Sequence, residues 1–408
     1  MSQTEVQLIK ADAVQTADIA NSAVTDAKIS GLTSSKLTGA LPAISGASLT
    51  NLPASGKAKN LVVNGAMQIA QRATSSTSSL YAAVDRFRMA YASVDENPTS
   101  EQANVATDTT PYSLGFTKCL KVTNGNQTSG AGSSDRIAFE YRIEAQDVAR
   151  SGWDYQSTSG KITLSFWIRS SVAQNFYLYF ETADGTAQAY AMETGSLSAN
   201  TWTKVTKTIP GKPSLQFDND ANLGLKLYFS YFTGTDYTDN SQALNTWGTY
   251  NTASRFPDNT STWYTTNDAT LEITGVQLEV GDSATDFEHK TFAEDLHACQ
   301  RYYDKSYSYS VSPGTATSTG AVVHTLSGSY NYAGFPIEFT RSMRADPTIT
   351  LYSTNNGNTG KTSADSGDGN ASVSYQNEKR AFVFRANSNN GMGTNVFLRC
   401  QFQADAEL

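Results

Sequence analysis

The feature that most constrains the fold is an alternation of apolar and polar residues, repeated in several segments between Asn60 and Asp286. In IAFEYRIE (137–144), Ile, Phe, Tyr and Ile alternate with Ala, Glu, Arg and Glu, which is the period of a strand with one face in a core. The same period recurs in KITLSFWIRS (161–170), NFYLYF (175–180), WTKVTKTI (202–209) and LGLKLYFSYF (223–232). Turn-rich segments separate these strands and no helical periodicity interrupts them. The pattern predicts a mostly β fold with a two-sheet sandwich or jelly roll at 60–290.

Residues 306–408 also carry strand-like segments. These are GAVVHTLS, GFPIEF, TITLYS, ASVSYQ, AFVFRA and NVFLRCQF. The polar, glycine-rich stretch from Ser353 to Asn370 predicts an exposed loop among them. We therefore expect a second, C-terminal all-β domain at 306–408, placed as the outer tip of the molecule.

The first 59 residues follow a different pattern, a short repeat. AVQTADIANS (13–22) aligns with AVTDAKISGL (23–32), so that Ala-Val, Ala and Ile recur every ten residues. Single apolar residues stand among small and polar ones at Ile19, Ile29, Leu37, Leu41, Ile44, Leu49 and Leu52. One chain can shield few of them, whereas three copies wound about an axis would bury each as an inward ring. We predict a trimerising stem at 1–59; the alternative is a disordered leader.

Charge and composition exclude several classes of partner. The formal net charge is −8, only 17% of residues are charged and no basic block occurs, which argues against nucleic acid and anionic membrane surfaces. No apolar run approaches the roughly 18 residues of a membrane-spanning helix, and MSQTEVQLIKADA lacks the pattern of a signal peptide. We expect no membrane insertion and synthesis in a reducing cytoplasm. The three scattered cysteines then predict reduced, buried thiols.

The segment DFEHKTFAEDLHACQRYYDK (286–305) is the exception to the β pattern. Its apolar residues follow a helical stripe at Phe292, Leu296, Cys299 and Tyr303. Thr291, followed three residues later by Glu294, has the spacing of a capping box. We predict a short amphipathic helix at 291–305 that connects the two β domains.

The same segment concentrates groups that could carry chemistry, but their spacing argues against it. His289 and His297 are eight residues apart, without the His-x-His or HExxH spacing of a metal site. Gly281-Asp282-Ser283 matches an esterase triplet, yet the helix content and chain order of that fold are missing. The paired acids Asp286/Glu288 and Glu294/Asp295 fit a solvated helix surface better than a glycosidase pair. We predict no catalytic residue, no metal and no cofactor, although the acidic loop FDNDAN (217–222) leaves a structural Ca²⁺ open.

Several motifs together resemble a family of bacteriophage tail-fibre and receptor-binding proteins. They are NLVVNGAMQIAQRAT (60–74), DRFRM (85–89), GVQLEVG (275–281), the turn at Phe287–Lys290, LHACQRYY (296–303), RSMRADPTITLY (341–352) and the leader LPAISGASLTNLPA (41–54). Their order and spacing match that family, in which the first three motifs belong to a jelly roll. This sequence departs at His289-Lys290, where an Arg is more usual, and it lacks the large tail-anchoring domain of many such fibres.

The resemblance implies a homotrimeric, non-enzymatic fibre on the virion. A phage tail or adaptor protein would hold the N-terminus, and a bacterial surface glycan or outer-membrane receptor would be the target. Linked sites on a rigid trimer would raise avidity by roughly 10² to 10⁴ over one shallow site. Because the chain is acidic overall, we expect salt to weaken binding little.

Sugars present hydroxyls and an apolar CH face, so exposed aromatic rings among polar residues are candidates for binding them. The segment 244–268 supplies such rings at Trp247, Tyr250, Trp263 and Tyr264, which could instead pack beneath a long loop. A second set lies out of phase on the strands, at Trp167, Tyr177, Tyr179 and Tyr228, and could instead form another core face. The loop at 353–370 of the expected tip is a third candidate, and its distal position favours it.

Two further functions remain open. A depolymerising tail spike would cleave surface polysaccharide and release reducing ends, with Asp286 or Glu288 as required groups. A head-fibre or decoration protein would contribute to the virion without changing its adsorption.

Overall fold

The computed structural model describes residues 60–326, 332–364, 367–377, 379–387 and 396–408. The predicted stem at 1–59, with its seven axis candidates from Ile19 to Leu52, lies outside these ranges and stays a prediction.

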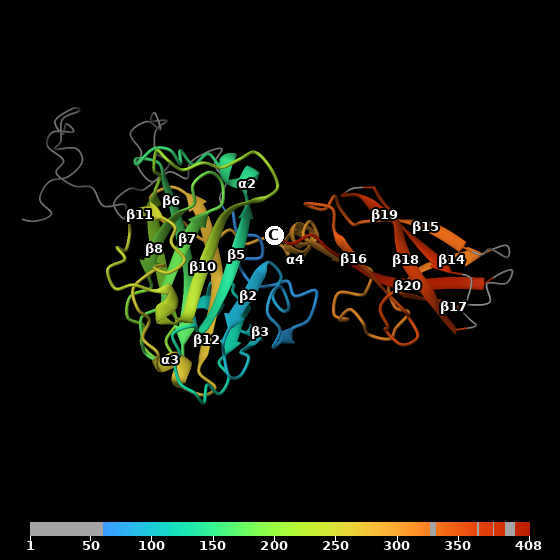
Figure 1. Cartoon of the computed structure of the whole chain (residues 1–408), viewed down its shortest axis with the longest axis horizontal. Coiled ribbons are helices and arrows are strands. Elements are labelled where there is room, and N and C mark those ends of the chain that lie inside the picture. Colours follow the sequence, from blue (N-terminus) through green and yellow to red (C-terminus); the bar gives the residue numbers. More distant parts are fainter. Residues whose placement is uncertain (1–59, 327–331, 365–366, 378, 388–395) are drawn as a thin grey trace, which may run out of the picture. The chain divides into compact units, whose positions relative to one another are not determined.

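Two antiparallel sheets stack face to face between residues 75 and 280, as Figure 1 shows. One has the order β1-β3-β4-β12-β6-β9, with bounds Ser75–Ser76, Thr99–Asn104, Lys118–Thr123, Thr270–Val280, Lys161–Ser170 and Thr203–Pro210. The other has the order β11-β8-β7-β10-β5-β2, with bounds Trp247–Thr249, Gln188–Glu193, Tyr177–Thr182, Leu223–Thr233, Arg136–Glu144 and Phe87–Ala92. The predicted β-sandwich is therefore confirmed.

The alternation in the sequence sets which face of each strand is buried between the sheets. On β5, Ile137, Phe139 and Tyr141 are at most 1% exposed and belong to the main core. Phe139 stacks on Phe229 of β10, with ring centroids 5.3 Å apart and an interplanar angle of 7°. Burying each such side chain contributes about 1.5–3 kcal/mol, so these in-phase residues hold the sheets together.

Strand β10 is buried on both faces. Its out-of-phase residue Tyr228 is 3% exposed, although it points away from the main core. Tyr179 of β7, Ala138 of β5 and Phe256 from the segment after β10 bury it in a second, smaller cluster. Residues 234–260 thus cover part of the outer face of this sheet. They leave a recess whose base is the sheet and whose side is formed by these residues.

Short helices also occur between the strands, contrary to the sequence-based expectation. These are α1 (Thr110–Ser113), α2 (Ala145–Ala149), α3 (Thr262–Thr265) and the 3₁₀ turn η5 (Thr235–Tyr237). Each spans about one turn, which is too short to produce a visible 3.6-residue period.

The connecting helix is confirmed as α4 (Phe292–Cys299), with the complete Thr291/Glu294 capping box. Cys299 and Tyr303 are each 1% exposed and Leu296 is half-buried, as the apolar stripe predicts. Phe292 is a correction, because it is 48% exposed and lies at the first position of the helix, where its ring makes an edge contact with Tyr309. The predicted end of the helix at 305 is also wrong, because α4 ends at Cys299 and Tyr303 lies in strand β13 (Tyr303–Lys305).

The C-terminal residues form a further antiparallel sheet with the path β13-β20-β17-β18-β19-β15, and β14 and β16 also pair with β20. The bounds are Tyr303–Lys305, Val322–Leu326, Tyr332–Glu338, Thr348–Tyr352, Lys361–Ala364, Gly367–Asn377, Ala381–Asn387 and Val396–Asp405 for β13 to β20 in turn. The six predicted strands are confirmed. The predicted exposed loop at 353–370 is wrong in part, since β17 lies within it and Thr362 and Ser363 are fully buried.

The three cysteines, Cys119, Cys299 and Cys400, are free and buried, as predicted. Burial raises the pKa of Cys119 and of Cys400 to about 12, so both remain protonated thiols at neutral pH. Among the described residues, no helix has the length and apolarity needed to cross a bilayer.

Candidate functional site

The motif residues of the sequence converge on one buried cluster, which we call the joint: Asn64, Arg72, Asp85, Arg86, Tyr302, Tyr303, Asp405 and Glu407. Asn64 adopts a left-handed backbone (φ 61°), and its side chain bonds the backbone of Ile69 and Asp85. Arg72 lies over the Tyr303 ring at 3.7 Å and pairs with Asp405 at 2.9 Å. The joint therefore ties the start of the sandwich to the strand after α4 and to the end of β20.

Arg86 is the centre of the joint. Its guanidinium is 1% exposed, pairs with Glu407 and donates to the carbonyl oxygen of Arg142 at 2.6 Å. Burial raises the pKa of Glu407, although Arg86 and Arg72 oppose the shift. Burial likewise raises the pKa of Asp85 against the opposing charge of Arg72. Such compensated, enclosed charges are typical of structural ion networks as well as of active sites.

Four further side chains of the 286–305 segment also have structural partners. Arg301 makes two hydrogen bonds to the fully buried Glu144, at 2.8 and 2.6 Å. Glu294 is used by the capping box, and Glu288 lies 3.8 Å from Lys290. The exposed His289 ring packs against Phe116 and Phe287, at centroid distances of 5.0 Å. Within the described residues, no three His, Cys, Asp or Glu side chains converge as a metal site.

Two of the four aromatic candidates are not available to a ligand. Trp263 and Tyr264 are 0% and 1% exposed. Trp263 stacks on Tyr231 and Tyr264 on Phe232, at centroid distances of 5.3 and 4.4 Å. Because they occupy the single turn of α3, which closes one end of the sandwich core, both rings turn inward, and the sequence-based assignment of these two is wrong.

The other two candidates are half-buried. Trp247 donates its indole N–H to the carbonyl of Pro210 at 2.7 Å and packs on Tyr190. Its ring is therefore part of the packing of the sandwich. Tyr250 lies beside Tyr179, with ring centroids 5.9 Å apart, and lines a groove. Tyr250 is thus the member of the set that a ligand can reach.

The second set of aromatics divides in the same way. Tyr179 and Tyr228 stack on each other at 4.9 Å and form the floor of the groove. Tyr177 is half-buried and stacks on Phe256. Trp167 is half-buried on β6 in the opposite sheet, where it pairs with Thr274 and Lys204. The structure therefore brings together Tyr179, Tyr228 and Tyr250, and leaves Trp167 apart.

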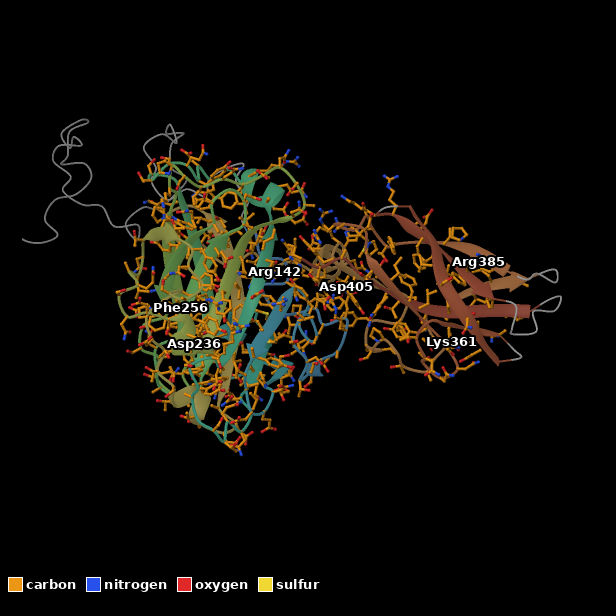
Figure 2. All side chains as sticks on the ribbon, in the orientation of Figure 1. Arg142, Asp236, Phe256, Lys361, Arg385 and Asp405 are labelled. Carbon is orange, nitrogen blue, oxygen red and sulfur yellow. The ribbon has the colours of Figure 1, made fainter. Side chains whose placement is uncertain are left out.

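The groove has a volume of about 320 Å³ and crosses the outer face of the sheet that contains β2, β5, β10 and β7. The strand register explains its layout. Arg88, Glu140, Tyr228 and Tyr179 are direct neighbours across these four strands, in that order. The next row contains Arg142, Lys226 and Glu181. Side chains opposed in this way lie about 4.5–5.5 Å apart at Cβ, so the sheet itself positions the lining (Figure 2, in which Arg142 and Phe256 are labelled).

The groove is positively charged, unlike the chain as a whole. Its lining includes five cationic side chains and one carboxylate: Arg88, Arg136, Arg142, Lys226, Arg255 and Glu140. Glu140 accepts from Arg88 at 2.9 Å and from Arg142 at 2.7 and 3.0 Å. Burial alone would raise the pKa of Glu140, but Lys226, Arg142 and Arg88 together lower it. The carboxylate is therefore ionised at neutral pH, and charged side chains surround the rings of Tyr179 and Tyr228.

Sequence reasoning missed these charged residues. Glu140 and Arg142 lie at outward positions of a predicted strand, so the alternation predicted which face of the sheet they are on. The alternation could not predict which residues lie beside them on the adjacent strands, because β2, β5, β10 and β7 are not consecutive in the chain. Arg255, in an irregular segment, carried no signal.

No protein-family model and no curated protein matches the chain. Among solved structures, the enzymatically active domain of bacteriophage CBA120 tailspike protein 4 matches with a TM-score of 0.29 and 12% identity, over 54% of this chain and 21% of that one. A family 11 carbohydrate-binding module from Clostridium thermocellum matches with a TM-score of 0.23 and 10% identity, over 53% and 99%. The N-terminal cellulose-binding domain of a Cellulomonas fimi glucanase gives 0.24 and 12%, over 42% and 82%. Similarities of this size carry no assignment of function.

Proposed function

We propose that this chain is a non-enzymatic attachment protein of the bacteriophage tail-fibre type, which binds a bacterial surface glycan in the groove. The row Arg88–Glu140–Tyr228–Tyr179 is the observation that carries the proposal. It places hydrogen-bonding charged groups beside a buried pair of rings that supports Tyr250, the ring that a ligand can reach. A sugar requires that combination, because its hydroxyls need donors and acceptors while its CH face needs an apolar surface.

The size of the groove supports this use. A volume of about 320 Å³ lies at the lower end of the range for ligand sites, which is roughly 300–1,000 Å³. Tyr250 is half-buried at its edge and offers the ring face that a sugar can contact, whereas Tyr179 and Tyr228, 1% and 3% exposed, are buried beneath the groove and support Tyr250. A site of this kind on one chain is shallow, so attachment would depend on several copies.

The fibre part of the proposal rests on the motifs. Three of those that resemble the tail-fibre family, at 60–74, 85–89 and 296–303, supply residues of the joint, so these three have a common structural purpose in this fold. The stem at 1–59 would supply the homotrimer and the attachment to a tail or adaptor protein. The proposal places binding in the sandwich and moves it away from the C-terminal domain favoured by the sequence alone.

The joint also determines how the proposal should be tested. Deleting residues 306–408 would remove Asp405 and Glu407, which would leave the buried Arg86 without its carboxylate and Arg72 with Asp85 alone, 3.8 Å away. A loss of binding would then have no clear meaning. Point variants of the full chain avoid this problem.

The experiment measures adsorption of labelled, full-length protein to a panel of bacterial strains. We expect saturable binding to a host strain, competition by its purified surface polysaccharide, and a loss of about tenfold or more in the Tyr250→Ala variant. Tyr112→Ala is the matched control, because Tyr112 is 37% exposed on α1 and does not line the groove. Binding that Tyr250→Ala and Tyr112→Ala leave equally intact would contradict the groove as the site. Release of new reducing ends from the polysaccharide would contradict the non-enzymatic reading.

A further inference from the structure

Two arginines at one end of the groove share a single aromatic ring. The guanidinium carbons of Arg136 and Arg255 lie 5.0 and 4.9 Å from the ring centroid of Tyr237. The backbone N–H of Arg255 donates to the carbonyl of Tyr237 at 3.0 Å, which fixes the loop against η5. Arg255 also lies 5.5 Å from the ring of Tyr228 on the groove floor. This end of the groove therefore holds two like charges in a small, rigid space.

The other cations of the groove have carboxylate partners. Glu140 serves Arg88 and Arg142, and Glu181 pairs with Lys226 at 2.7 Å. Arg136 and Arg255, in contrast, make no ion pair within 4.0 Å among the described residues. Arg255 is only 9% exposed, and its Nε atom has no hydrogen-bond partner. Its side-chain hydrogen bond in the described structure runs from an Nη atom to Thr252 Oγ1 at 3.1 Å.

This arrangement is unfavourable without a ligand. A buried guanidinium loses hydration, and contacts with ring faces replace only part of it. The enclosed Nε–H of Arg255 has no acceptor, so this guanidinium is incompletely satisfied, and an anion in the groove that it lines would supply its missing counter-charge. Planar oxyanions are the natural complement, because arginine binds carboxylate and phosphate through two parallel hydrogen bonds.

We propose that the Arg136/Arg255 end of the groove binds an anionic group, a carboxylate or a phosphate, carried by the saccharide. This inference rests on the proposed function and narrows it to acidic glycans. The neutral part of the sugar then lies against Tyr250, above the buried rings of Tyr228 and Tyr179. Although the chain is acidic overall, binding at this site should weaken as salt rises, contrary to the expectation from net charge.

The test uses full-length protein and paired probes in calorimetric titrations at low and high salt. Tetragalacturonate is compared with its methyl ester for the carboxylate, and glucose 6-phosphate with glucose for the phosphate. The variant is Arg136→Gln, since Arg136 is half-buried and its removal spares the buried Arg255. Arg169→Gln is the control, because Arg169 lies on β6 of the opposite sheet, paired with Glu272.

We expect at least one acidic probe to bind tenfold or more tightly than its neutral partner, with a loss of about tenfold in Arg136→Gln and none in Arg169→Gln. The acidic probe that binds identifies the source of the anion. The inference is overturned if neither acidic probe exceeds its neutral partner, or if both variants behave alike. If the protein still binds cells after the Arg136→Gln change and at high salt, this inference is overturned and the proposed function stands. If the protein binds no cells at all, the proposed function itself is contradicted.

Discussion

Arg86 lies over the ring of Tyr302, with its guanidinium carbon 3.4 Å from the ring centroid. One residue begins the sandwich and the other follows α4, so a single stacking contact joins segments more than two hundred residues apart. Glu407 supplies the counter-charge from the end of β20. The joint is thus assembled from three distant parts of the chain.

Replacing Arg86 by alanine should destabilise the fold strongly. Glu407 would remain buried with one of its two cations gone, and breaking a buried pair in this way costs about 3–5 kcal/mol. We expect that loss in the free energy of unfolding, measured by urea denaturation. Arg169→Ala is the comparison, since its pair with Glu272 is more exposed and worth about 0–1 kcal/mol. Equal effects from the two variants would show that the joint is not a stabilising element.

Trp263 offers a test of the corrected aromatic assignment. Trp263→Ala should cost about 3–5 kcal/mol, because it leaves a cavity beside Tyr231 in the sandwich core. Trp263→Phe should cost much less, since the indole N–H has no hydrogen-bond partner to lose. Thermal unfolding measures both. Cell binding by the folded Trp263→Phe protein should match wild type, and a selective loss of binding would restore Trp263 as a ligand residue.

Gly275, in the GVQLEVG motif, should tolerate no side chain. Its φ is +63°, and an added Cβ would lie 2.7 Å from the Cζ atom of Phe116. Backbone strain and overpacking together predict a loss of about 2–5 kcal/mol for Gly275→Ala. Gly130→Ala isolates the strain, because Gly130 also has a positive φ but has open space around it. The difference between the two variants in urea denaturation measures the steric part, and no difference would contradict the close approach.

Glu140 should make stability depend on pH in the acid range. Its pKa is lowered in the folded state from about 4.5, so its stabilising effect is complete above that value and disappears as pH falls through the folded pKa. Glu140→Gln should therefore be about 1.5–3 kcal/mol less stable than wild type at pH 7, with a gap that narrows as the pH falls below 4.5 and through the folded pKa. Unfolding curves collected from pH 3 to 7 check this. A gap that is constant over the whole range would mean that the carboxylate charge is not what stabilises the site.

The features that could be predicted from the sequence are those set by residues close together along the chain. The alternation at 137–144 gave the strand and its buried face, and Thr291 with Glu294 gave the start of α4. The groove needed the order of four non-consecutive strands, and the joint needed pairs such as Arg86 with Glu407, 321 residues apart. A single sequence carries no signal for such distant pairs. Trp263 and Tyr264 were misassigned because a polar, turn-rich context does not reveal which rings turn inward.

The joint also determines when, during synthesis of the protein, the fold can be completed. Glu407 is synthesised 321 residues after Arg86, an interval of roughly 15–65 s at 5–20 residues per second. The strands of the sandwich are complete once Val280 has been made, and from then until Glu407 follows they lack the counter-charge of the buried arginine. The nascent sandwich must therefore leave this face hydrated or shielded by a chaperone, and the arrival of β20 completes it. Final closure of the sandwich is thus a late step of biosynthesis, set by the distance between two ion-pair partners along the chain.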